Sequence, residues 1–271
     1  MGYRTILVEL QADRSPAARL SVACAMARRF DAHLIGLHVA PEPYVPVLWE
    51  GGGAVYLGPE LLDMQRKAIQ ETEQRVKALF DELCGGESAM TWRTAEGEPE
   101  LLIAEMARSA DLVISTGERA ELGAATGLAE ALLTAAGVPV LVLPPSYEGD
   151  GGRAALVGWD GSREATRAVH AALPFLQAAE QVVLCAIGTQ AAASLEDAAR
   201  MLRRHEVKVE PEHVAGSDKD AGDKLLAQAA AHGAELLVMG AYGHTRLREL
   251  VFGGATRQML RTATLPVLFG S

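Results

Sequence analysis

The chain has little of what would assign it to several large classes of protein. No apolar run reaches the length of a membrane span, and Met1 to Ile6 enters a strand-like segment without a secretory leader. Ile6 also stands where a myristoylation motif needs Ser or Thr. The net charge of −10 argues against general nucleic-acid binding, which needs a basic surface to neutralise phosphates. We therefore expect neither a membrane nor a nucleic acid as a partner.

Common catalytic signatures are missing as well. The seven histidines are scattered singly, so the sequence predicts no metal site. It contains neither the Gly-x-Ser-x-Gly turn of many hydrolases nor the Gly-x-x-x-x-Gly-Lys-Ser/Thr loop of Walker-type ATPases. The three cysteines, Cys24, Cys84 and Cys185, are odd in number and far apart. This indicates a reducing, cytoplasmic location in which each cysteine is a small buried apolar side chain.

What the chain does contain is an internal repeat. The apolar segment Ile6-Leu-Val8 begins one copy, and Ala155-Leu-Val157 begins a second after the polar, glycine-rich residues 146–152. In both copies short apolar strands alternate with helix-length segments. This alternation predicts an α/β fold made of two tandem doubly wound domains, residues 1–147 and 153–271. Each should be a five-strand parallel sheet in the order 3-2-1-4-5 with helices on both faces.

The two copies end on similar short apolar strands, 138–143 and 265–269. These strands should lie at the sheet edges, where unpaired backbone groups favour pairing with another strand. We expect the two domains to form an intramolecular pseudo-dimer through these edges, and a further homodimer is an open alternative.

The first copy carries an insertion from Pro41 to Pro59, which has four prolines and three consecutive glycines and is interpreted as a long surface loop. The following helix has Leu62, Ile69, Val76 and Leu83 at seven-residue spacing. This stripe fits packing on its own sheet, with helix-mediated dimerisation as the alternative.

The strongest local signal is a pair of glycine turns. Gly240-Ala-Tyr-Gly243 directly follows an apolar strand, and Gly253-Gly254 precedes a helix that begins near Thr256. Glycines allow a ligand to approach backbone N–H groups, and a helix N-terminus attracts anions. The spacing therefore predicts a phosphate cradle.

Local charge supports the cradle. Residues 242–261 carry four arginines, at 246, 248, 257 and 261, against the single acid Glu249. His244 or Arg246 is expected to touch phosphate, the alternative being that both are plain surface residues. Asp160, in the turn-forming Asp160-Gly-Ser162, is either a helix-capping residue or a ligand contact, and the downstream glycines favour the ligand contact.

The arrangement of strand, Gly-x-x-Gly, nine residues, glycine pair and helix resembles the universal stress protein family. Asp160-Gly-Ser162 and Glu98-Pro-Glu100 fit the same resemblance, which covers the whole chain as two fused copies. It implies a cytoplasmic stress-response sensor or regulator that binds ATP or another adenine nucleotide in its second domain, with Mg²⁺ as an accompanying candidate. Slow ATP hydrolysis and a nucleotide-independent scaffold or small-ligand carrier are the alternatives.

The resemblance also implies roles for individual residues. Asp160 would contact the ribose or the base edge, Trp159 and Ile187 would line the adenine slot, and Met239 would flank base and sugar. The N–H groups of Gly240, Gly243, Gly253, Gly254 and Ala255 would face the phosphates. Gly254 stands where the family has Ser or Thr, so a hydroxyl is lost that Thr256 could replace.

The first copy departs from this pattern. Thr116 and Arg119 stand where the second copy has Gly240 and Gly243, and Gln11 stands where it has Asp160. Glu118, Glu121 and Glu130 make the segment acidic. We expect one nucleotide site per chain, the alternative being that Asp13 and Gly117 rebuild a second site by local shifts.

Overall fold

The computed structural model describes residues 2–11, 16–44, 47–50, 53–56, 59–87, 89–117, 127–145, 147, 149, 152–217, 220–242 and 254–270. The first half of the chain contains β1 (Thr5–Glu9), α1 (Pro16–Phe30), β2 (His33–Ala40), β3 (Val47–Glu50), β4 (Gly53–Tyr56), α2 (Pro59–Cys84), β5 (Met90–Glu96), α3 (Pro99–Ala107), β6 (Leu112–Thr116), α4 (Leu128–Ala135) and β7 (Val140–Leu143). The second half contains β8 (Ala154–Trp159), α5 (Arg163–Ala178), β9 (Gln181–Ile187), α6 (Thr189–Arg204), β10 (Val209–Val214), α7 (Ala221–Ala231), β11 (Leu236–Gly240), α8 (Gly254–Thr262) and β12 (Val267–Gly270).

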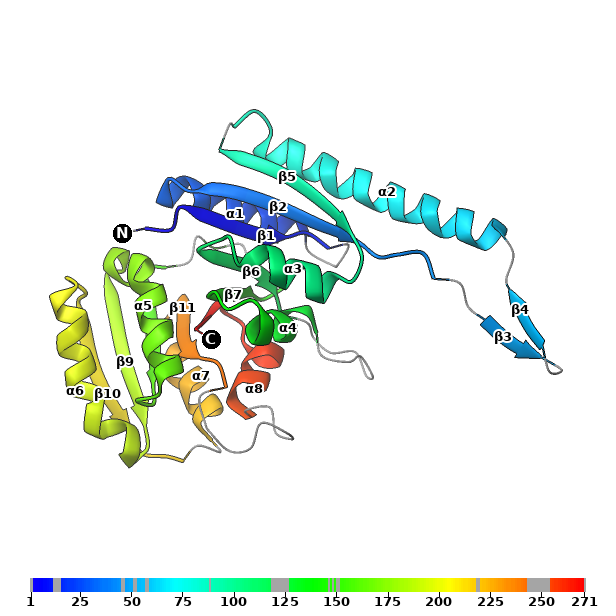
Figure 1. Ribbon diagram of the computed structural model, residues 1–271. Helices are drawn as coiled ribbons and strands as arrows, with labels where there is room; N and C mark the ends of the chain where they lie inside the picture. Colours follow the sequence, from blue (N-terminus) through cyan, green and yellow to red (C-terminus); the bar gives the residue numbers. More distant parts are fainter. Residues whose placement is uncertain are drawn as a thin grey trace.

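Ten strands form one continuous sheet, in the order β10-β9-β8-β11-β12-β7-β6-β1-β2-β5 (Figure 1). Within each half the pairs are parallel and the order is 3-2-1-4-5, so this prediction is confirmed. The halves meet where β7 pairs antiparallel with β12, the two edge strands expected to pair. The sheets of the two halves therefore join into a single sheet, and Leu141 lies directly opposite Leu268 at the junction.

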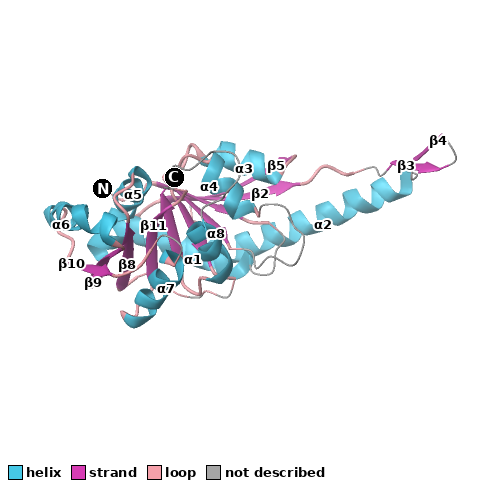
Figure 2. Cartoon of the chain, turned by 90° about the horizontal axis from the view of Figure 1, so that it is seen from below, coloured by secondary structure: helices cyan, strands magenta, loops and turns pink. Residues whose placement is uncertain are grey.

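The sheet is buried on both faces, because its central strands are near-continuous runs of Val, Leu and Ile. One face packs against α1, α2, α5 and α6, and the other against α3, α4, α7 and α8. Figure 2 shows helices on both sides of the strands. No helix of the described chain is long and apolar enough to cross a membrane.

An arm projects from the first half. The expected loop at residues 41–59 is in fact partly a hairpin, in which β3 pairs antiparallel with β4. The hairpin lies at the far end of α2, away from the body of the molecule (Figures 1 and 2). The buried residues of α2 are Val76, Phe80 and Cys84, whereas Leu62 and Ile69 are only half-buried. Packing on its own sheet thus explains only the C-terminal part of the predicted stripe.

The cysteines also differ from expectation. Cys24 of α1 and Cys84 of α2 are joined in a disulfide, so the prediction of three isolated thiols is wrong for this pair. The prediction failed because 60 residues separate two positions that the packing of α1 against α2 brings together. Cys185 of β9 is a buried free thiol, as predicted.

Candidate functional site

The candidate site lies where the strand order of the second half reverses. Strands β8 and β11 are parallel neighbours whose chains leave toward opposite faces of the sheet, and such a point is where doubly wound folds bind ligands. Trp159 ends β8, Ile187 ends β9, and Met239 and Gly240 end β11. The structure thus brings four of the predicted residues to one edge of the sheet.

Asp160 follows β8 and begins a turn into α5. Its Oδ1 accepts a hydrogen bond from the Ser162 N–H at 2.9 Å, and the Ser162 Oγ accepts one from Ala165 N at 3.1 Å as the N-cap of α5. Gly161 adopts φ +77°, which an L side chain would strain. Asp160 therefore does stabilise the turn before α5. Asp160 is also exposed at the sheet edge where β8 ends.

Trp159 and Ile187 are half-buried beside the start of α6. The Trp159 indole N–H donates to Ser194 Oγ at 3.0 Å, which fixes the ring against that helix. Next to Ile187, Gly188 has φ +80° and caps α6, and a Cβ on Gly188 would come within 3.0 Å of the Gly216 carbonyl oxygen. The chain is consequently tightly folded at the end of β9.

Helix α8 is tied to the end of β11. Thr256 is buried in its first turn, and its Oγ1 accepts a hydrogen bond from Tyr242 N at 3.4 Å. Tyr242 has φ +59°, and burial, with a smaller effect of Glu130, raises its pKa to about 12. Because Thr256 already holds the strand end, its hydroxyl has a structural role that the sequence did not predict.

Two helices begin side by side at this edge. A Cβ on Gly222, in the first turn of α7, would lie 3.5 Å from the Ala255 Cα in the first turn of α8. The Gln258 amide of α8 bonds the Asp223 carboxylate of α7. Gly254 is exposed, and no acidic residue occurs in the first turn of α8. The first turn of α7 carries Asp223, whereas that of α8 has no acidic residue, so the N-terminus of α8 is the one that favours an anion.

Gly240 lies against the first turn of α5, where a side chain would not fit. A Cβ at this position would come within 2.6 Å of Ala165 N and 2.7 Å of the Glu164 carbonyl carbon, so α5 itself fills the space. Met239 is buried between the sheet and the α7–α8 layer. The missing side chain at Gly240 thus lets the start of α5 pack on β11, and a ligand contact to its backbone N–H stays a prediction.

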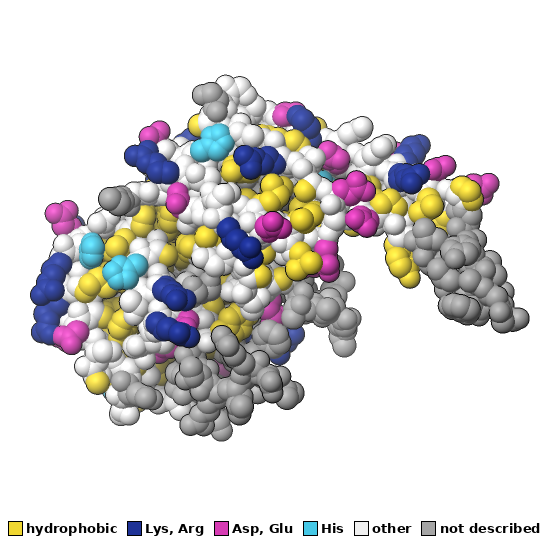
Figure 3. Space-filling model, in the orientation of Figure 1, with side chains coloured by type: hydrophobic (Ala, Val, Ile, Leu, Met, Phe, Trp, Pro, Cys, Tyr) yellow, Lys and Arg dark blue, Asp and Glu magenta, His cyan; other side chains and the backbone are white. Residues whose placement is uncertain are grey.

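Gly243, His244, Arg246 and Gly253, together with Arg248 and Glu249, lie outside the described residues. Two members of the arginine cluster, Arg257 and Arg261, are described. Arg257 forms an ion pair with Glu130 of α4 at 3.4 Å, and Arg261 lies in the last turn of α8, at the opposite end from the proposed cradle. On the face seen in Figure 3, cationic and anionic side chains are mixed.

The equivalent edge of the first half holds a buried ion pair. Glu9 at the end of β1 and Arg19 of α1 are 2% and 1% exposed, with Arg19 Nη2 3.4 Å from Glu9 Oε2. Arg19 Nε donates to the Glu9 carbonyl oxygen at 2.7 Å, and Arg19 Nη1 donates to Thr116 Oγ1. The Ser115 hydroxyl donates to Glu9 Oε1 at 3.0 Å. Polar side chains of β1, β6 and α1 thus fill the point where strand order reverses.

The strand registers identify the residues that replace this network in the second half. The pairing of Ile6 with Leu112 in the first half corresponds to the pairing of Ala155 with Leu236 in the second. Counting along the strands from these pairs places Glu9 at the position of Gly158 and Thr116 at the position of Gly240. The second half therefore has glycines where the first half has the Glu9 carboxylate and the Thr116 hydroxyl. The sequence analysis did not predict the Glu9–Arg19 pair. The signals for it were a charged residue, Glu9, at the end of an apolar strand and another, Arg19, inside an apolar helix.

Other first-half residues are engaged structurally. Gln11 lies beside β2, where its amide donates to the Val39 carbonyl at 3.0 Å and accepts from Val39 N at 3.1 Å. A Cβ on Gly117 would come within 2.9 Å of the Leu260 carbonyl oxygen of α8. Asp13, Glu118, Arg119 and Glu121 lie outside the described residues. In the part of the chain that the structure describes, no group of three or more His, Cys, Asp or Glu is placed to hold a metal ion.

Comparisons with known proteins agree with this geometry. The sequence model of the Universal stress protein family matches residues 153–269. Universal stress protein Slr1230 of Synechocystis sp. is 38% identical over 79 residues, which are 29% of this chain and 26% of that protein, so the chain matches a minor part of that relative's length. The crystal structure of a universal stress protein from Archaeoglobus fulgidus DSM 4304 superposes with a TM-score of 0.72 at 15% identity, covering 98% of this chain and 97% of that one. A structure from Pseudomonas aeruginosa UCBPP-PA14 gives 0.58 at 18% identity, covering 98% and 92%.

Proposed function

Because the chain belongs to the universal stress protein family through residues 153–269, we propose that its second half binds ATP or another adenine nucleotide and acts as a cytoplasmic stress sensor or regulator. In this proposal residues 1–147 and 153–271 are two domains with unequal roles. The second binds the nucleotide, and the first supports it through the shared sheet.

The contrast between the halves carries the proposal. At the point of strand-order reversal, the first half holds the buried Glu9–Arg19 pair, whereas the second half has Gly158 and Gly240 at the positions of Glu9 and Thr116. A nucleotide in the first half would have to displace a fully desolvated ion pair, which is costly because it leaves buried charges unpaired. Gly158 and Gly240 have no side chains, so no ion pair occupies these two positions in the second half.

The second half also supplies groups suited to a nucleotide. The start of α8 favours phosphate, with Gly254 and Ala255 offering backbone N–H groups. Asp160 is exposed and could accept hydrogen bonds from ribose hydroxyls. Trp159, Ile187 and Met239 would line the base, with Gly243, His244, Arg246 and Gly253 completing the phosphate contacts.

Calorimetric titration of the full chain with ATP, with and without Mg²⁺, tests the proposal. We expect one site per chain, abolished by Gly243→Val with the circular dichroism spectrum unchanged. The matched control is Gly127→Ala: Gly127 precedes α4 as Gly254 begins α8, and its φ of −65° accepts alanine. Two sites per chain, or full affinity in Gly243→Val, would overturn the proposal.

Asp160→Asn separates the ligand role of Asp160 from its turn role. The asparagine side-chain oxygen can still accept from Ser162 N, so the fold should be unchanged while the contact to the nucleoside loses its charge. Mass spectrometry of ligand released from freshly purified protein identifies the compound. Retained ATP fits a sensor, ADP alone indicates hydrolysis, and absence of any nucleotide contradicts the proposal.

A further inference from the structure

We propose that Cys24 and Cys84 are a reversible dithiol–disulfide pair, and that its oxidation locks the projecting α2 arm onto α1. This inference does not depend on nucleotide binding. It rests on where the two cysteines lie, on what else holds α2, and on the surface ion pair beside them.

The geometry places the two cysteines at a junction between helices. Cys24 lies within α1, and Cys84 is the last residue of α2. Their Cα atoms are 6.7 Å apart, within the range that a disulfide spans, and the two sulfurs are joined. Each residue is 2% exposed. The bond therefore links α1 and α2 covalently, in addition to their packing and the hydrogen bond from Arg28 to the Leu83 carbonyl.

The attachment of α2 is concentrated around this bond. The helix spans 26 residues, and its buried residues Val76, Phe80 and Cys84 all lie in the C-terminal third. Its N-terminal part continues past the sheet to the β3–β4 hairpin (Figure 1). A covalent link at Cys84 thus acts on the short segment that anchors the whole arm.

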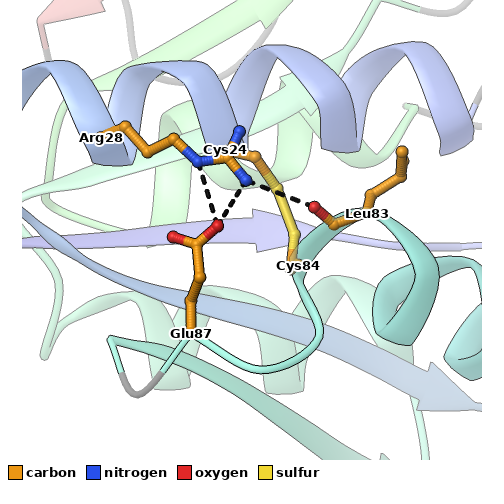
Figure 4. The surroundings of a disulfide bond; sticks show 5 residues. All are labelled: Cys24, Arg28, Leu83, Cys84 and Glu87. Atoms are coloured by element: carbon orange, nitrogen blue, oxygen red, sulfur yellow. Dashed lines mark hydrogen bonds and ion pairs between the residues drawn. A yellow bond between two sulfur atoms is a disulfide. The ribbon is translucent and has the colours of Figure 1, made fainter.

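A surface ion pair lies beside the disulfide. Glu87 Oε1 lies 2.5 Å from Arg28 Nη2, and these side chains are 42% and 52% exposed (Figure 4). Arg28 Nη2 also donates to the Leu83 carbonyl at 3.4 Å, and the bond to Glu87 raises the pKa of Arg28. Gly85 and Gly86 follow Cys84, with Gly86 at φ +90°. A helix end beside two glycines, held by a surface ion pair, opens at low cost and exposes its last residue to solvent.

A hydroperoxide can serve as the oxidant that converts the two thiols into the disulfide. The thiolate of one cysteine attacks the peroxide oxygen, giving a sulfenic acid and releasing hydroxide, or alkoxide from an organic peroxide, which takes up the proton. The second thiolate then attacks the sulfenic sulfur, forming the S–S bond and displacing hydroxide, which takes up the proton lost by the second thiol to give water. Two thiols lose two electrons and two protons in all. A small dithiol reverses the step by thiol–disulfide exchange and becomes a disulfide itself.

Cys185 provides a matched control within the same chain. It lies buried on β9 in the second half, and burial, with a smaller effect of Glu212, raises the pKa of its thiol to about 11. A protonated, buried thiol reacts slowly with peroxide. Oxidation is therefore expected to spare Cys185.

The test compares the full-length protein after native treatment with dithiothreitol and after hydrogen peroxide. Thiols are counted in denaturant by maleimide mass shift. We expect three thiols after reduction and one after oxidation, in a monomeric product, with peptide mapping that joins Cys24 to Cys84. Renewed dithiothreitol under native conditions should restore three. Three thiols after peroxide, an intermolecular link, or a bond that resists native reduction would each overturn the proposal.

The second readout is the attachment of the arm. Closing a loop of this length should raise the midpoint of thermal unfolding by on the order of 10 °C in the oxidised protein, and amide hydrogen exchange in residues 76–84 should slow. Cys185→Ser should respond like the wild type, whereas Cys24→Ser and Cys84→Ser should show no response to peroxide. The comparison of oxidised with reduced wild type needs no variant, so it decides the question even where a serine variant fails to fold. Equal exchange of residues 76–84 in the two redox states would contradict the lock.

Discussion

Arg257 of α8 and Glu130 of α4 form an ion pair 3.4 Å apart although they occupy equivalent positions in the two halves. They are 127 residues apart, the same separation as Leu141 and Leu268, which face each other where β7 meets β12. In a symmetric dimer of identical subunits, a residue near the two-fold axis faces its own copy. Here the two copies have opposite charges, so this contact favours pairing of unlike halves.

Charge reversal at this contact should destabilise the chain, and a second reversal should restore it. Arg257→Glu places two carboxylates together, with Glu130 12% and Arg257 41% exposed. Because the pair is only half-buried, we expect a loss of about 1–2 kcal/mol. The double variant Glu130→Arg/Arg257→Glu should regain most of it. Urea unfolding measures both, with reversal of the exposed Arg203–Glu196 pair as the control. No recovery in the double variant would show that the pair does not couple the halves.

The buried Glu9–Arg19 pair should be sensitive to removal of one partner. Arg19→Met leaves the Glu9 carboxylate desolvated beside Ser115 and Thr116, at an expected cost of about 3–5 kcal/mol. The double variant Glu9→Leu/Arg19→Met removes both charges and should recover much of this loss. Chemical denaturation of the three proteins provides the measurement. Equal stability of wild type and Arg19→Met would mean that the pair is not buried in solution.

Glycines 240 and 254 should differ in their tolerance of a side chain. Gly240→Ala drives a Cβ into the backbone of α5 and should cost about 1–3 kcal/mol in thermal unfolding, with or without ATP. At Gly254 a Cβ meets no described atom within 4 Å, so Gly254→Ala should leave stability nearly unchanged. Gly254→Ser should also raise ATP affinity roughly tenfold, by adding a hydroxyl beside the phosphates. Unfolding of Gly254→Ala would contradict this assignment.

Alkaline pH should destabilise the protein partly through Tyr242. Its pKa is raised to about 12 in the folded chain, whereas an unfolded tyrosine titrates near 10. The folded state therefore holds the phenol proton more tightly, and this contribution to stability, complete below pH 10, is lost as the pH rises from about 10 to about 12. Tyr242→Phe should flatten the fall in unfolding free energy between these pH values. An unchanged slope would show that Tyr242 titrates normally.

Sequence reasoning predicted the strand order because the alternation of apolar strands with helices leaves few topologies. It missed the β3–β4 hairpin, since four prolines and a glycine run obscured two four-residue strands. It also missed the Cys24–Cys84 bond, which requires knowing that α1 packs on α2.

The positions of the candidate residues in the fold were predicted better than their contacts. Asp160 and the start of α8 lie where the motif placed them, because strand ends and helix starts follow from local pattern. The true neighbours of Gly240 and Thr256 could not be predicted, since α5 and Tyr242 reach them only through tertiary packing. The same holds for Arg257, whose partner Glu130 lies in the other half.

The antiparallel junction of β7 with β12 has a consequence for behaviour on dilution. Two separate subunits joined by such an edge come apart when their concentration falls below the dissociation constant, whereas halves of one chain face each other at a fixed effective concentration. The β7–β12 junction therefore stays formed at any protein concentration. A cell holding few copies of this chain would have the same fraction of formed junctions as one holding many.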